Sequence, residues 1–430
     1  MNTKDLRNAY PKKVIVKLNQ LANEYVPALE ELVLINKRPA DVEVALLFRK
    51  RKEFGSRDRR FLSRIIFSYF RWRGWTKNQL KLSLTESFYL SELLEEDNNE
   101  QWLEFLEQKL PSFKKLSFKN LSLKQKAELI SQEFKSKITI ENLMPSFFQN
   151  HSNDNIEEFI INSQKRPPVW IRSRIDRKIL IDAFNLAEIK TDIHLNMIAS
   201  IKTSSGINLN QKIREHRSKF VIQDLSSQCV GIVCMPLAGQ IWWDCCAGSG
   251  GKSFHLADLM QQQGRILSTD IRESALQELK KRSRIYGIKT IKTQFFNLID
   301  GSQMKHRFDG VLVDAPCSGW GTWGRNPDAK WRTSSDEIKK FASKQLKILS
   351  NASVGVKDNG VMIYSVCTVT KEETFEVIES FLKKNSEFFL ENFINPLDGT
   401  NTNGTLQIYP NNHDGMFIAR IRKGGVKDGI

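Results

Sequence analysis

The sequence predicts a parallel, doubly wound α/β sheet, preceded by a small α/β subdomain and an all-helical N-terminal domain. From residue 240 onward, short apolar runs alternate with amphipathic stretches, as in strand–helix–strand units with right-handed crossovers. Residues 1–145 instead carry apolar residues three and four positions apart, with few Gly or Pro. We therefore predict three domains, at residues 1–145, 165–228 and 229–430.

The helical domain contains one strongly basic stretch. Residues 49–73 hold ten Lys or Arg against two acidic residues, and the aromatic residues Tyr69, Phe70, Trp72 and Trp75 are interleaved with the end of this stretch. This pattern favours a surface that contacts RNA phosphates, to which we expect Arg59, Arg60 and Arg64 to contribute. The alternative is an amphipathic core helix whose charged face is solvated.

The small subdomain follows a polar boundary at 146–165. Residues 167–175 read as a strand, 177–189 as a helix and 194–201 as a further strand, and the subdomain ends near 219–228.

The third domain has six predicted strands, at 240–244, 265–270, 290–296, 308–314, 360–367 and 416–423. Helices are predicted at 252–263, 273–287, 336–353 and 372–384. Sheets of this type bind ligands at the carboxyl ends of their strands.

A glycine-rich turn, "DCCAGSGGKS" (244–253), follows the first of these strands. Its glycines permit a tight turn and close approach of the backbone to a ligand, and Asp270 at the end of the next strand could accept from ribose hydroxyls. A dinucleotide and S-adenosylmethionine both fit this arrangement. A phosphate loop fits poorly, because position 246 is Cys where that motif needs Gly. A purely structural turn stays possible.

Two cysteines follow strands that should be neighbours. Cys317 lies just after strand 308–314 and Cys367 ends strand 360–367, so both thiols should meet at one edge, beside Asp314. Either cysteine alone is more typical of a small buried hydrophobic residue. Together with a methyl donor, a thiolate could add to carbon 6 of cytosine and activate carbon 5 for methylation.

Composition limits the other possibilities. The formal net charge of +16 suggests a nucleic-acid partner. The six cysteines lack disulfide-scaffold or zinc spacing, so we expect reduced thiols, no metal and a cytoplasmic location. We expect no signal peptide in residues 1–13, no membrane span and a monomer.

The motifs resemble those of the Sun-domain family of RNA cytosine-5 methyltransferases over residues 165–423. "DAPCSG" (314–319) and "YSVCTVTKEE" (364–373) resemble its two cysteine motifs, and "CCAGSGGK" (245–252) its methyl-donor loop. "QDLSSQ" (223–228), "NPDAKW" (326–331) and "HDGMFIARIRK" (413–423) resemble further motifs in the family's order. Residues 56–74 resemble, less specifically, the NusB-like RNA-binding domain that some members carry.

The resemblance implies a Rossmann-like class I S-adenosylmethionine-dependent methyltransferase fold and assigns the site. Cys367 would be the nucleophile, Cys317 would assist product release, and Asp314 would lie between donor and cytosine. The donor would be held by Cys246, Ala247, Gly248, Ser249, Gly250, Gly251, Lys252, Asp270, Asp314 and either Asn297 or Asp300. Two departures from the family, Ser249 for Pro and Val366 for Thr, remove no reacting group.

The implied activity is methylation of carbon 5 of cytosine in RNA, with 16S ribosomal RNA as the expected substrate. The alternatives are a tRNA or DNA cytosine methyltransferase, of which the DNA enzymes use a single Pro-Cys nucleophile, and a non-catalytic RNA-binding ribosome-assembly factor.

Overall fold

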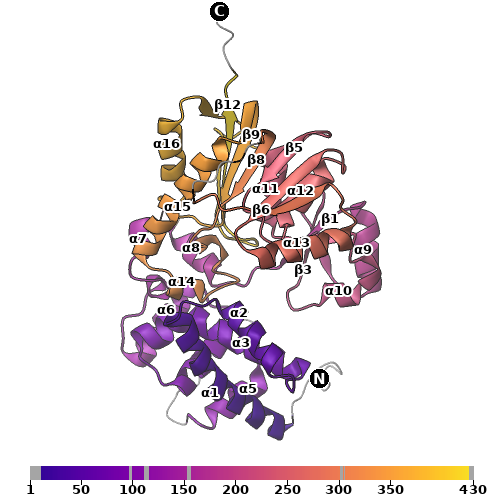
Figure 1. Cartoon of the computed structure of the whole chain (residues 1–430). Helices are drawn as coiled ribbons and strands as arrows, with labels where there is room; N and C mark the ends of the chain where they lie inside the picture. The colour runs from indigo at the N-terminus through magenta and orange to yellow at the C-terminus, as the bar shows by residue number, and fades with distance from the viewer. Residues whose placement is uncertain are drawn as a thin grey trace, which may run out of the picture. The chain divides into compact units, whose positions relative to one another are not determined.

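The computed structural model describes residues 11–95, 99–110, 116–152, 156–300, 304 and 306–425 (Figure 1). The first ten residues, part of the stretch in which we expect no signal peptide, lie outside the described residues. The chain forms two compact units. The helical unit comprises residues up to 150, 154–165 and 323–334, and the sheet unit comprises 151–153, 166–322 and 335 onward.

The helical unit is a cluster of amphipathic helices around one apolar core. Its helices are α1 (Lys12–Leu34), α2 (Ala40–Lys50), α3 (Ser56–Arg73), α4 (Leu84–Leu94), α5 (Glu100–Glu107), α6 (Leu123–Phe134), α8 (Ile156–Ser163) and α14 (Ala329–Arg332), with the short α7 (Phe148–His151) at its border. A π-helical turn (Gly74–Gln79) continues α3, and a 3-10 turn covers Ile140–Leu143.

The aromatic residues of the basic stretch belong to this core. Tyr69, Phe70 and Trp75 are fully buried and Trp72 is 3% exposed, so they are not available to stack on RNA bases. The prediction of a basic surface interleaved with aromatic residues is therefore wrong for its aromatic part. Arg64 does not add to the basic surface either, because its guanidinium pairs with the buried Glu92. From Ile65 to Trp72 almost every residue of α3 is buried, so this half of the helix lies within the core rather than at the surface.

Residues 323–334 pack with the helical unit, although the sequence between two sheet strands gives no sign of this. The Lys330 ammonium donates to the backbone carbonyl of Arg71, and the Trp331 indole N–H donates to that of Phe70. Lys330 is fully buried, and burial lowers its pKa well below the usual range. The unit is thus completed by a segment distant in sequence.

The sheet unit begins with a small antiparallel sheet of order β2-β3-β1-β4. It contains β1 (Val169–Ser173), α9 (Arg177–Leu186), β2 (Thr191–Ile193), β3 (Ser200–Thr203), α10 (Leu209–Lys212), a 3-10 turn (Arg214–His216) and β4 (Phe220–Ile222). The strand predicted at 194–201 is wrong in its first part. His194 Nδ1 accepts from the N–H groups of Asn196 and Met197, which closes a turn between β2 and β3.

The main sheet has the strand order β10-β12-β9-β8-β5-β6-β7, with β11 paired to β12. Its elements are α11 (Leu225–Cys234), β5 (Ile241–Asp244), α12 (Gly251–Leu259), β6 (Arg265–Asp270), α13 (Glu273–Tyr286), β7 (Ile291–Phe295), β8 (Phe308–Asp314), a 3-10 turn (Trp320–Thr322), α15 (Ser335–Ser353), β9 (Val356–Val366), α16 (Phe375–Lys384), β10 (Phe388–Leu390), β11 (Thr405–Ile408) and β12 (Met416–Lys423). The Rossmann-like α/β fold is confirmed.

Both faces of this sheet are buried, as a parallel sheet requires. Trp242 points to the face that packs with α11, α12 and α13, and the adjacent Trp243 points to the face covered by α15 and α16. The prediction of an all-parallel sheet is wrong at one edge. β12 runs antiparallel to β9 and β10, since the β9–α16–β10 crossover skips one position and β12 returns to fill it.

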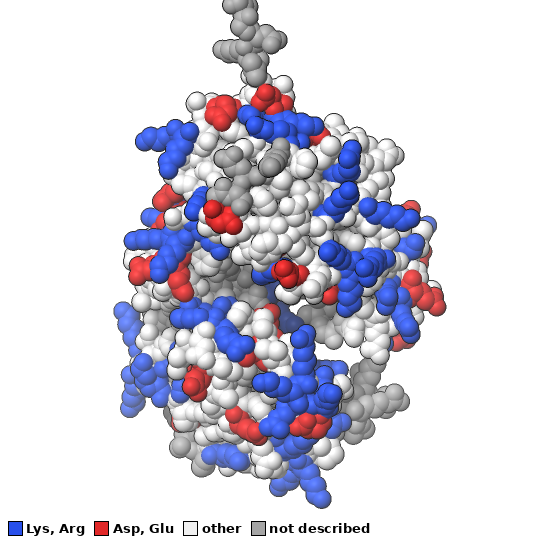
Figure 2. Space-filling view, in the orientation of Figure 1, with Lys and Arg blue, Asp and Glu red and all other residues white. Residues whose placement is uncertain are grey.

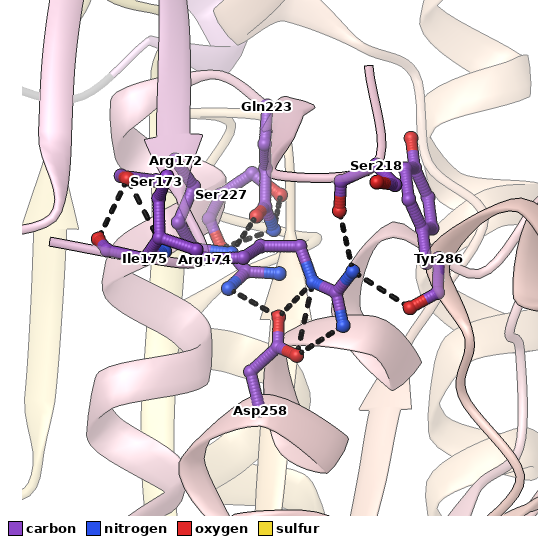
Figure 3. A network of polar contacts seen from close by, with 9 residues as sticks. All are labelled: Arg172, Ser173, Arg174, Ile175, Ser218, Gln223, Ser227, Asp258 and Tyr286. Atoms are coloured by element: carbon purple, nitrogen blue, oxygen red, sulfur yellow. Dashed lines mark hydrogen bonds and ion pairs between the residues drawn. The ribbon is translucent and has the colours of Figure 1, made fainter. Parts of the chain in front are cut away.

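A buried ionic network ties β1 to α12 (Figure 3). Arg172 and Arg174 both bind the carboxylate of Asp258, with nitrogen–oxygen distances of 2.7 and 2.8 Å. Arg174 also donates to the carbonyls of Ser218 and Tyr286. Because α12 begins at the glycine-rich turn, this network fixes the small sheet to the helix that carries that turn.

We predict that Asp258→Ala lowers the free energy of unfolding by about 3–5 kcal/mol, because it leaves two buried guanidinium groups without their carboxylate. Chemical denaturation followed by circular dichroism measures this change. Asp192→Ala, which breaks the exposed pair with Lys202, is the control and should change little. An equal, small effect of both variants would contradict the prediction.

Candidate active site

A cavity of about 660 Å³ opens at the carboxyl ends of β5, β6, β8 and β9. The strand order reverses between β5 and β8, and this switch point is where doubly wound sheets bind ligands. The sequence-predicted residues that line the cavity are Cys246, Ala247, Gly248, Ser249, Gly251, Lys252, Asp270, Asn297, Asp314, Cys317 and Cys367.

Two positions of the turn require glycine, each for a different structural reason. Gly248 and Gly250 both adopt the left-handed backbone conformation, with φ of +54° and +89°. A Cβ at Gly250 would lie 2.7 Å from Leu279 Cγ and 2.8 Å from Phe254 Cζ. Gly250 is absent from the cavity lining and instead allows α12 and α13 to pack closely against the turn.

Ser249, which stands where the family commonly has Pro, is held from outside. The Arg282 guanidinium on α13 donates to both the carbonyl and the hydroxyl of Ser249, each at 3.0 Å. The same guanidinium lies 5.0 Å from the ring centroid of Phe254. A serine in place of proline would loosen the turn, and the hydrogen bonds from Arg282 on α13 offset this loss.

Asp270 lies at the end of β6 and is already bonded by protein groups. Its Oδ2 accepts from the Gly248 N–H at 2.9 Å, and its Oδ1 accepts from the backbone and side chain of Arg272. Burial alone would raise the pKa of Asp270, but these hydrogen bonds outweigh it and hold the pKa below its usual value. A ribose would have to displace the Arg272 side chain, which is 65% exposed and has room to move.

Asp314 ends β8 and is oriented by two neighbours. Its Oδ2 lies 2.7 Å from Lys252 Nζ, and its Oδ1 accepts from the Ser365 hydroxyl at 2.8 Å. Burial would lower the pKa of Lys252, but the charges of Asp314 and Cys367 raise it above its usual value. The Lys252 ammonium is thus a fixed positive charge beside the carboxylate.

The two predicted strand neighbours bring the two cysteines together, which confirms that expectation. β8 and β9 pair in parallel with Asp314 opposite Ser365, and Cys317 Sγ lies 3.3 Å from Cys367 Sγ. Both thiols are partly exposed to the cavity. The hydrogen bond with Cys367, followed by burial, raises the pKa of Cys317 well above its usual value. The raised pKa keeps the Cys317 thiol protonated near neutral pH.

Glu373 is a further residue of the site, and it lies within the second cysteine motif, in which the resemblance assigns it no role. It is fully buried, and its carboxylate accepts from the Ser318 N–H at 2.9 Å and from the Thr370 hydroxyl at 2.8 Å. The Gln345 amide also donates to it at 2.9 Å. One carboxylate therefore joins the loop after Cys317 to the loop after Cys367.

Two further cavity residues clarify the predicted donor site. Asn297 lines the cavity whereas Asp300 does not, so Asn297 is the better candidate of the two. Asp244, which the sequence analysis did not select, is a buried lining residue that accepts from Ser253 at 2.6 Å. Burial raises the pKa of Asp244 to about 7. Its position at the carboxyl end of β5 is the sequence feature that could have identified it as a site residue.

The sheet order, the glycine-rich turn and the carboxylates at the strand ends define a Rossmann-like fold of the S-adenosylmethionine-dependent methyltransferase class. Residues 232–422 match the family model described as 16S rRNA methyltransferase RsmB/F. This match confirms the predicted resemblance to the Sun-domain methyltransferases.

Curated relatives carry the same name. The chain is 33% identical over 216 residues to the probable ribosomal RNA small subunit methyltransferase B of Bacillus subtilis, covering 47% of this chain and 48% of that one. It is 30% identical over 289 residues to methyltransferase B of Photorhabdus laumondii, covering 62% of each chain. The matches thus span about half to three fifths of these relatives.

Solved structures share the fold. PH0851 superposes with a TM-score of 0.70 at 23% identity, covering 93% of this chain and 98% of that chain. NSun6 from Pyrococcus horikoshii, solved with SFG, gives 0.52 at 18% identity over 61% of this chain and 92% of its own. Within the described part of the sequence, no helix has the length and apolar character to cross a membrane.

We predict that Glu373→Gln accelerates alkylation of Cys317, because the negative charge of Glu373 contributes to the raised pKa of that thiol. Glu373→Ala should in addition lower the free energy of unfolding by about 1–3 kcal/mol, since buried donors lose their acceptor. Mass spectrometry after pH-controlled alkylation reports each cysteine separately.

Glu372→Gln is the matched control for this experiment. Glu372 makes a hydrogen bond with His151, so its substitution leaves the hydrogen bonds from Ser318 and Thr370 to Glu373 in place. Cys317 alkylation that stays at the wild-type rate in Glu373→Gln would show that Glu373 does not act on the thiols.

Proposed function

We propose that the protein methylates carbon 5 of cytosine in RNA, with 16S ribosomal RNA as substrate and S-adenosylmethionine as donor. The observation that carries this proposal is the pair of thiols 3.3 Å apart at the edge of a methyltransferase cavity, beside Asp314. The names of the relatives support an RNA substrate.

The cavity fits the donor on structural grounds. Asp244 Oδ1 is buried and has no well-aligned hydrogen-bond partner among the described residues, so it suits a ligand that brings a cationic donor group. The backbone of residues 246–249, with Lys252, Asp270 and Asn297, would surround the rest of the ligand. When bound, S-adenosylmethionine supplies an electrophilic methyl group on a sulfonium.

The protein's own residues would activate the base. The Cys367 thiolate adds to carbon 6 while the ring nitrogen takes a proton from water, and Asp314 stabilises the protonated nitrogen, which leaves an enamine with a nucleophilic carbon 5. After methylation, water takes the proton of carbon 5 and the ring nitrogen gives up its added proton. The double bond between carbons 5 and 6 then re-forms and the Cys367 thiolate is expelled. Cys317, in contact with Cys367, assists this release.

The charge of the surface supports an RNA partner. Figure 2 shows Lys and Arg side chains over the visible face of both units. In the helical unit, six exposed cations lie around the α2–α3 turn: Arg49, Lys50, Arg51, Lys52, Arg57 and Arg60. Arg59 is half-buried and donates to a backbone carbonyl. We propose that this turn, rather than the buried aromatic residues, contacts RNA phosphates in the manner expected of a NusB-like domain.

Mapping bisulfite-resistant cytosines in RNA from cells with and without the gene tests this function. One lost site in 16S ribosomal RNA is the expected result. A lost site in tRNA or DNA would change the substrate, and no lost site together with RNA binding would favour a non-catalytic assembly factor.

We predict that Asp270→Ala weakens S-adenosylmethionine binding by about 1.5–3 kcal/mol, the contribution of a hydrogen bond to a charged group. Isothermal titration calorimetry measures this directly. Asp309→Ala serves as the control. It removes a carboxylate that is paired with Lys357 at the start of β8, whereas the cavity lies at the carboxyl end of that strand. Donor affinity that is unchanged in Asp270→Ala would remove this residue from the site.

The two cysteine variants should fail differently. Cys367→Ala should abolish methylation and form no adduct, because the nucleophile is gone. Cys317→Ala should methylate and then stall as a covalent protein–RNA complex, visible on denaturing gels with RNA and donor. An adduct that accumulates in Cys367→Ala instead would reverse the roles and favour the single-cysteine mechanism of DNA enzymes.

A further inference from the structure

The sheet unit carries its own dense cluster of positive charge, outside the cavity. Residues 280–292, from the end of α13 to the start of β7, contain six Lys or Arg and no acidic residue. A hollow of about 390 Å³ lies here, lined by Lys280, Ser283, Arg284, Ile291, Lys292 and Thr293. We call this the α13–β7 hollow.

The helix period explains why the charges converge. Lys280, Ser283 and Arg284 are spaced i, i+3 and i+4 and so share one face of α13. Like charges at i and i+4 destabilise a helix, and no acidic residue lines the hollow to relieve them. An anion bound between them would remove this repulsion.

Several other cations of the sheet unit are already paired with carboxylates. Arg420, Arg422 and Lys357 are paired with carboxylates at distances of 2.5–2.6 Å. Lys280, Arg284 and Lys292 are exposed, and within the described residues no ion pair holds any of them. Arg282 on the same helix is used differently, because it binds Ser249 of the glycine-rich turn.

An exposed aromatic ring lies on the same strand. β7 is the edge strand of the sheet, and Phe295 at its carboxyl end is 54% exposed. Phe295 pairs in register with Asp270, so β7 runs from the hollow at Lys292 to the border of the cavity. Phe295 lies three positions after Lys292, or about 10 Å along the strand, on the face of β7 that carries Ile291 and Thr293 of the hollow.

We infer that the α13–β7 hollow is an RNA-binding site of the sheet unit, in which Lys280, Arg284 and Lys292 hold backbone phosphates and Phe295 stacks on a base. Cations along a backbone track with an aromatic platform beside it are the elements that bind single-stranded nucleic acid. This inference rests on the proposed RNA substrate and adds to it a second contact, on the unit that carries the thiols.

The test compares charge-matched variants of the full chain. Lys280→Ala/Arg284→Ala/Lys292→Ala removes three cations from the hollow, and Lys347→Ala/Lys383→Ala/Lys384→Ala removes three exposed cations from α15 and α16. Affinity for a single-stranded ribosomal RNA fragment is measured against salt concentration. The slope of log affinity against log salt should flatten by about 2 in the first variant, at about 0.7 per phosphate contact, and stay at the wild-type value in the second.

Phe295→Ala tests the platform against Phe389→Ala, an equally exposed ring on β10 at the other edge of the sheet. Phe295→Ala alone should weaken RNA binding, by about tenfold. Equal losses in the two phenylalanine variants, equal losses in the two charge variants, or a wild-type slope after removal of the hollow's cations would each overturn the inference. Methyl transfer by the unaltered chain is scored separately. Its absence would refute the proposed function, while the binding comparison would still decide whether the hollow holds RNA.

Discussion

The parallel pairing of β8 and β9 is the constraint on which the site depends. Neighbouring strands lie about 4.8 Å apart, and their register sets Asp314 opposite Ser365. Cys317 follows three residues after Asp314 and Cys367 two residues after Ser365, and this brings the two thiols into contact. Glu373 then holds the two following loops together, so the position of the thiols is decided by backbone pairing and one buried carboxylate.

Much of this arrangement could be predicted because it follows from local patterns. Strands 265–270, 308–314 and 416–423 have the predicted bounds, since each is a short apolar run between turn residues. The meeting of Cys317 and Cys367 follows from strand adjacency alone. By contrast, β12 is antiparallel because it inserts between β9 and β10, and no local sequence pattern indicates that position in the sheet.

What the sequence did not predict depends on partners that are distant along the chain. The basic stretch of α3 left open whether its aromatic residues fill the core, because an amphipathic core helix and a nucleic-acid surface can have the same composition. The hydrogen bond from Arg272 to Asp270 depends on the side-chain conformation, which the sequence does not give. The hydrogen bond from Arg282 to Ser249 joins residues 33 positions apart.

The inclusion of residues 323–334 in the helical unit has a consequence for the order of events during synthesis. Domains generally fold as units, starting from the N-terminus as the chain emerges. Here the helices α1 to α8 cannot obtain Lys330 and Trp331 until β1 to β8 have already been translated. The N-terminal unit, although first to leave the ribosome, must therefore wait in an incomplete state for a segment made long after it.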